Sequence, residues 1–73
     1  MDKIGVRTAQ AIRERAKQNG TSVRQECQKI NVLPGNISNW EKGKVNPTAY
    51  FLQEMALAGY DVIWILTGRK YEN

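Results

Sequence analysis

Apolar residues recur at intervals of three and four along most of this chain, which is the spacing of one face of a helix. The first such series consists of Val6, Ala9, Ile12 and Ala16. It predicts a helix from about Thr8 to Gln18. Helices fit the pattern better than strands throughout, so the expected fold class is all-α.

A second helix is predicted to begin at Ser22. The Ser22 and Gln25 side chains lie three residues apart and form a capping box, in which each satisfies a backbone N–H that the helix leaves unpaired. Val23, Cys27 and Ile30 follow at helical spacing and form the inward face of this helix.

A short turn, Asn31-Val32-Leu33, leads into a third helix from Pro34 to Lys42. Pro34 suits the first helical position, where the missing N–H of proline costs nothing. Ile37 and Trp40 lie three residues apart and share the inward face. We therefore assign Trp40 to the core rather than to base stacking.

Two further helices complete the expected fold. Asn46-Pro47 is a start signal, with Asn as the cap and Pro at the first helical position. It predicts a fourth helix from Pro47 to Ala58. A fifth helix runs from Asp61, which caps it, to Leu66. The expected inward residues of the fourth helix are Ala49, Leu52, Met55 and Ala56.

Glycine follows the end of four of these helices, where it can take the left-handed conformation that closes a helix. The four are Gly20, Gly43, Gly59 and Gly68. The 73 residues are expected to form one domain, with a core over about 6–68 and a polar tail over 69–73.

The chemistry of the chain does not favour an enzyme. It contains one cysteine and no histidine, and its seven acidic residues are scattered along the sequence. Histidine is the commonest general base and a common metal ligand, so we expect no catalytic site, no metal, no cofactor and no small-molecule substrate. Cys27 lies at an apolar helical position, which favours a small buried hydrophobe over a reactive thiol.

The chain has no apolar run long enough to cross a bilayer and no signal-peptide pattern at its N-terminus. We therefore expect a cytoplasmic protein without a membrane partner.

The net charge of +4 is unevenly distributed. Residues 1–44 carry nine Lys and Arg against four acids, a net +5, whereas residues 45–73 carry two against three, a net −1. A basic half suggests an anionic partner, although an ordinary solvated helical surface explains the charge equally well.

The chain resembles the phage-repressor/Cro-like (XRE-class) helix-turn-helix family over about residues 8–68. The resemblance is carried by Ser22, Ile30-Asn31-Val32, Ile37-Ser38-Asn39-Trp40-Glu41-Lys42-Gly43-Lys44 and Pro47, followed by Val62 and Leu66-Thr67-Gly68. The ending, Gly59-Tyr60-Asp61-Val62 followed by Leu66-Thr67-Gly68, resembles that of short prophage-encoded regulators. The resemblance implies a compact five-helix, lambda-repressor-like domain, with the helix-turn-helix at the second and third helices.

Members of this family typically bind operator DNA as dimers, with the third helix in the major groove. The resemblance places base contacts at Pro34, Gly35, Asn36, Ser38 and Asn39. Phosphate contacts are expected at Ser22, Arg24, Lys42 and Lys44. Asn46 is primarily a cap, and the helix N-terminus there could also receive a phosphate.

The sequence departs from the family pattern at four points. Polar residues are usual where Pro34 and Gly35 stand, and these two can only allow a close backbone approach or leave the readout to Asn36 and Asn39. Val23 replaces a residue that often meets phosphate. The remaining departures are Leu33 at the usual cap position and Glu26 at a usually apolar one.

Three charged residues of the first helix, Arg13, Arg15 and Lys17, are either phosphate contacts or part of a solvated face. Glu41 is expected to form a structural ion pair with Arg13 or Arg15 rather than to contact a cytosine.

The fifth helix is apolar almost all round, so some of its surface should remain exposed in a monomer. We expect Ile63 or Trp64 to lie in a homodimer interface. The expected function is a sequence-specific DNA-binding transcriptional regulator, a prophage-type repressor of a palindromic operator. The alternative is an antitoxin-type module whose main partner is a protein toxin.

Overall fold

Five helices and no strand make up residues 3–69, the part of the chain that the computed structural model describes. They are α1 (Ile4–Asn19), α2 (Val23–Lys29), α3 (Gly35–Glu41), α4 (Ala49–Leu57) and α5 (Val62–Thr67). The expected all-α class is confirmed. Of the predicted tail, residues 70–73 lie outside the described part.

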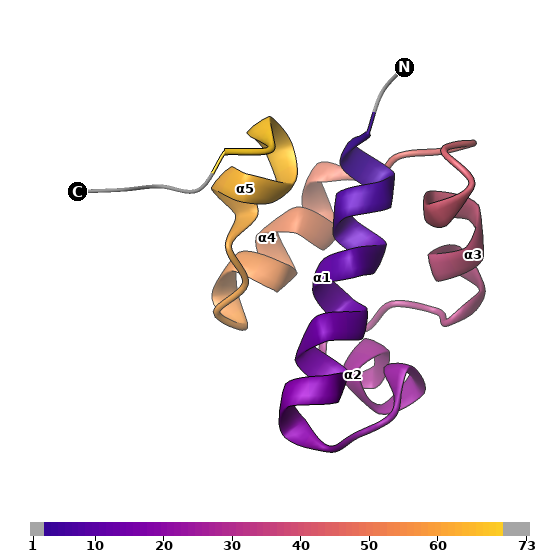
Figure 1. The fold of residues 1–73 in the computed structure, drawn as a ribbon, viewed down its shortest axis with the longest axis vertical. Helices are drawn as coiled ribbons and strands as arrows, with labels where there is room; N and C mark the ends of the chain where they lie inside the picture. The colour runs from indigo at the N-terminus through magenta and orange to yellow at the C-terminus, as the bar shows by residue number, and fades with distance from the viewer. Residues whose placement is uncertain (1–2, 70–73) are drawn as a thin grey trace.

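Helix α1 forms the centre of the molecule. It packs against α2, α3 and α5, and α4 packs against α5. In Figure 1, α3 lies on one side of α1, α4 and α5 lie on the other, and α2 crosses near its C-terminal end. The buried apolar cluster between them contains Ala9, Ile12, Cys27, Ile30, Val32, Ile37, Trp40, Met55, Tyr60 and Ile65.

The beginning of α1 differs from the prediction, because the helix begins at Ile4 rather than Thr8. Asn46 explains the difference: its Oδ1 accepts a hydrogen bond of 3.1 Å from the Gly5 N–H, one of the groups a helix start leaves unpaired. Gly5 also packs so closely that a Cβ would lie 2.7 Å from the carbonyl oxygen of Val45.

Helix α4 begins later than predicted. Its cap is Thr48, whose hydroxyl accepts from the Phe51 N–H, and Asn46 instead serves α1. The predicted burial is correct for Met55, which is fully buried, and partly so for Leu52, which is half-buried. It is wrong for Ala49 and Ala56, which are exposed because α4 turns a narrower face to the core.

Short-range signals predicted the other helix ends well. The Ser22–Gln25 capping box forms, with both of its hydrogen bonds present at 2.9 and 3.1 Å. Asp61 caps α5 through the Trp64 N–H. Backbone φ is positive at Gly20, Gly43, Gly59 and Gly68. Helix α3 is one residue shorter at each end than predicted, with Pro34 just before it.

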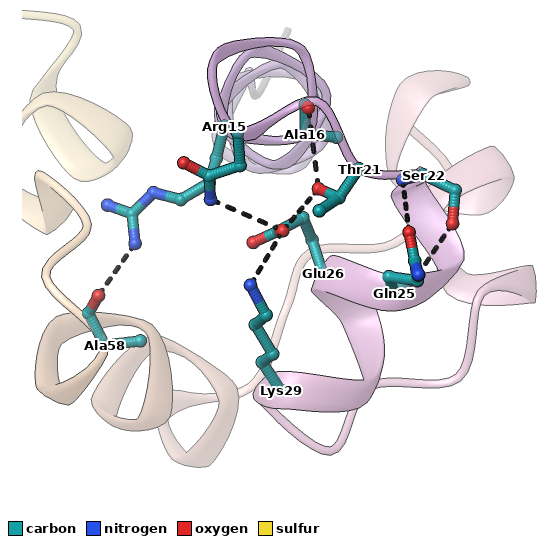
Figure 2. A network of polar contacts seen from close by, with 9 residues as sticks. Arg15, Ala16, Thr21, Ser22, Gln25, Glu26, Lys29 and Ala58 are labelled. Atoms are coloured by element: carbon teal, nitrogen blue, oxygen red, sulfur yellow. Dashed lines mark hydrogen bonds and ion pairs between the residues drawn. The ribbon is translucent and has the colours of Figure 1, made fainter.

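Glu26 is buried, with 2% of its surface exposed. Its carboxylate accepts hydrogen bonds from the Thr21 hydroxyl at 2.5 Å and from the Lys29 ammonium at 3.1 Å (Figure 2). The Asn19 amide donates a third at 3.4 Å. The Thr21 bond in particular holds the pKa of this carboxyl below its usual value, although burial alone would raise it. This cluster joins the end of α1 to α2.

Candidate nucleic-acid interface

Helix α3 presents a polar face to solvent. Ile37 and Trp40 are buried, with 3% and 2% of their surfaces exposed, so the opposite face of the helix points outward. At about 100° per residue, that outward face carries Ser38, Asn39 and Lys42, and all three are exposed.

The other predicted base contacts differ in position. Pro34 and Gly35 are exposed at the start of α3, next to the outward face. Asn36 is half-buried on the flank of the helix. The structure therefore brings four of the five predicted base-contacting residues to one exposed surface and places Asn36 at its edge.

Trp40 fixes the orientation of this surface. Its ring packs edge-on against Phe51 of α4, with the ring centroids 6.0 Å apart. The assignment of Trp40 to the core is confirmed, because a side chain this deeply buried cannot stack on bases.

The predicted ion pair of Glu41 is formed with Arg13 and not with Arg15. Arg13 Nε and Nη2 donate to the two carboxylate oxygens at 2.5 and 2.8 Å, a bidentate arrangement. These hydrogen bonds hold the pKa of the Glu41 carboxyl below its usual value. The one acidic residue of α3 is thus neutralised by α1.

Two other arginines of α1 are also bonded to the protein. Arg7 donates to the carbonyl oxygens of Ile65 and Leu66 at 2.7 and 3.3 Å. Arg15 donates to the Ala58 carbonyl oxygen at 2.7 Å, which Figure 2 shows. The Arg15 guanidinium carbon also lies 3.8 Å from the centroid of the Tyr60 ring. Of the three α1 residues with an open role, Arg13 and Arg15 serve the fold, and Lys17 is exposed.

By contrast, Arg24, Lys42 and Lys44 are exposed, and within residues 3–69 they form no ion pair. They come from the start of α2 and the end of α3. These three predicted phosphate contacts are therefore available to a partner of opposite charge.

The remaining two predicted phosphate contacts cap helices. Ser22 bonds both backbone and side chain to Gln25, and Asn46 bonds to the Gly5 N–H. The phosphate role of Ser22 and Asn46 stays a prediction.

The connection between α2 and α3 contains features that the sequence pattern did not reveal. Asn31 takes a left-handed conformation, with φ of 57°, which Asn tolerates better than most residues. Val32 is then buried, whereas Leu33 has 75% of its surface exposed. An open groove runs beside this connection. It is lined by Arg24, Gln28, Asn31, Val32, Leu33, Pro34 and Gly35.

Helix α5 exposes part of its apolar surface, as predicted. Ile63 has 52% of its surface exposed and Leu66 has 44%, whereas Ile65 is fully buried. Trp64 is half-buried. Leu57, at the end of α4, is also exposed, at 77%.

None of the helices in residues 3–69 has both the length and the apolar character that a membrane crossing requires. Comparison of the chain with protein families, with curated proteins and with solved structures gives no match.

Proposed function

We propose that this chain is a sequence-specific DNA-binding transcriptional regulator, a prophage-type repressor that binds a palindromic operator as a homodimer. The observation that carries the proposal is the surface of α3. It exposes Ser38, Asn39 and Lys42, and its one acid is paired with Arg13. The sequence resemblance to XRE-class regulators supports the same function.

In this proposal α2, the turn and α3 act as a helix-turn-helix, with α3 lying in the major groove. The Asn39 amide can form two hydrogen bonds with adenine, and the Ser38 hydroxyl can donate or accept at a neighbouring base edge. Arg24, Lys42 and Lys44 meet phosphates on either side, which supplies affinity but little sequence preference.

The proposed second copy binds through α5. Ile63 is half exposed on a helix that otherwise packs against α1 and α4, and exposed apolar clusters mark association sites. A two-fold axis would bring the same patch of both copies together and would give an operator with two inverted half-sites.

Selection of binding sites from random duplex DNA, at low and at physiological salt, tests the proposal. We expect an enriched palindrome whose half-sites lie about one helical turn apart. Asn39→Ala should cost about 1–3 kcal/mol at one position of each half-site and relax the preference there. Gln53→Ala removes an exposed amide from α4 and serves as the matched control.

The exposed apolar residues at α4 and α5, Leu57, Ile63 and Leu66, also fit a different protein partner, which is the antitoxin-type alternative. The same selection separates the two functions. If no sequence is enriched at either salt concentration, the DNA-binding proposal is wrong and the protein partner becomes the leading function.

A further inference from the structure

Leu33 is exposed and lines one groove with Arg24, a proposed phosphate contact, and with Pro34 and Gly35, two proposed base contacts. A single exposed leucine is ordinary on a protein surface, but this one is held outward by the backbone. Asn31 turns the chain with its positive φ, Val32 enters the core with 4% of its surface exposed, and Leu33 is left with 75%.

The two residues after Leu33 extend this apolar surface. Pro34 and Gly35 are exposed and neither has a polar side chain. A Cβ at Gly35 would meet no atom within 4 Å, so the surface is open rather than covered by the protein. Three consecutive residues therefore present hydrocarbon and backbone at the start of α3.

Charge indicates what covers this surface. The adjoining groove has Arg24 and Gln28 on its wall and no acidic residue among those that line it. Ser38, Asn39 and Lys42 continue the exposed surface along α3. An apolar patch within a basic and polar surface fits a nucleic acid better than an apolar protein partner.

The DNA major groove offers one apolar group, the 5-methyl group of thymine. We propose that Leu33, together with Pro34 and Gly35, recognises thymine through this methyl group. The inference rests on the proposed function and adds a contact that hydrogen bonding by Asn39 and Ser38 does not provide. Thymine is preferred because only its methyl group gives Leu33 an apolar surface to bury, whereas the other bases present polar groups there.

The test uses the full chain and the enriched operator, with each thymine replaced in turn by deoxyuridine, which lacks only the methyl group. We expect one or two positions in each half-site at which the replacement weakens binding about fourfold, the factor for one buried methyl group. Replacing cytosine by 5-methylcytosine at other positions controls for effects of methylation on the duplex.

A second variant connects the effect to the residue. Leu33→Ala should bind the thymine and deoxyuridine operators at those positions equally well. Leu57→Ala removes an equally exposed leucine, at 77%, from α4 and should keep the fourfold difference. Because Leu33 is exposed, its variant should fold, which circular dichroism checks.

The outcomes distinguish the two proposals. An enriched operator that is insensitive to deoxyuridine at every position overturns the role of Leu33 and leaves the proposed function intact. The absence of any enriched operator overturns both. A change in the oligomeric state of the free protein in Leu33→Ala, measured by sedimentation, would assign this surface to a protein contact and would also overturn the inference.

Discussion

Two groups of basic side chains, one on α1 and one near α3, differ in their partners. On α1, Arg13 bonds to a carboxylate of α3, Arg7 to carbonyl oxygens of α5, and Arg15 to the carbonyl oxygen of Ala58, which follows α4. Near α3, Arg24, Lys42 and Lys44 are exposed and make no ion pair within residues 3–69. In the net charge of the sequence, these six residues contribute equally. The comparison shows that basic charge indicates an anionic partner only after the cations that the fold uses have been set aside.

The largest effect, on the affinity for DNA, is expected from removing the three cations near α3. Replacing Arg24, Lys42 and Lys44 by alanine should weaken binding to all DNA sequences. The slope of log affinity against log salt should become shallower by about three per protomer, since each phosphate contact contributes about 0.9. Filter binding at several salt concentrations measures the slope, and the midpoint of thermal unfolding should not change.

Arg69→Ala is the matched control, because it removes an exposed positive charge beyond α5. It should leave the slope unchanged. If the triple variant keeps the slope of the parent protein, these residues do not meet phosphate.

A smaller effect is expected for the arginines of α1, and it should change stability rather than DNA binding. Arg15→Lys keeps the charge but loses the planar guanidinium that bonds to the Ala58 carbonyl and lies over Tyr60. We expect a loss of about 1–2 kcal/mol in the free energy of unfolding, measured by urea denaturation.

Tyr60→Phe tests the stacking part of that argument. It keeps the ring and removes a buried hydroxyl that has no hydrogen-bond partner among the described residues, so stability should not fall. Unchanged stability in Arg15→Lys, together with a shallower salt slope in Arg15→Ala, would place Arg15 with the cations that meet phosphate.

The smallest effect is expected for the exposed pair of Arg13 and Glu41, whose side chains are 52% and 39% exposed. The pKa of Glu41 is lowered in the folded state. The pair therefore contributes stability above the unfolded carboxyl pKa of about 4.3, and this contribution is lost as the pH falls through the lower folded value. Glu41→Gln should cost less than about 1 kcal/mol at pH 7.

Thermal melts at pH 7 and at pH 3 check this prediction. The difference between parent and variant should be smaller at pH 3 than at pH 7, because the pKa of Glu41 is lowered in the folded state. The acid sensitivity that comes from Glu26, whose pKa is also lowered, should persist in the variant. If the parent and Glu41→Gln differed in stability by the same amount at both pH values, the ion pair would not be the source of that difference.

The sequence predicted features that depend on neighbouring residues. The Ser22–Gln25 box, the Asp61 cap and the glycines after four helices are local signals, and each is present. The start of α1 was missed because its bond partner, Asn46, lies 41 residues away. Pairing of Glu41 with an α1 arginine could be predicted, but choosing Arg13 required the packing of α1 against α3.

The candidate site was predictable to a similar degree. Helical spacing placed Ser38 and Asn39 opposite the buried Ile37 and Trp40. The exposure of Leu33 was not predictable, because it depends on the backbone conformation at Asn31, which the apolar pattern does not specify.

The most direct test of the proposed interface is to map backbone amide chemical shifts by NMR while the operator duplex is added. We predict that the largest shifts lie at the start of α2, around Arg24, and in residues 31–44. The amides around Arg7 and Arg15, on the central helix, should shift little. Largest shifts on α1, or no shifts with any duplex at low salt, would contradict the proposal that the surface of α3 binds DNA.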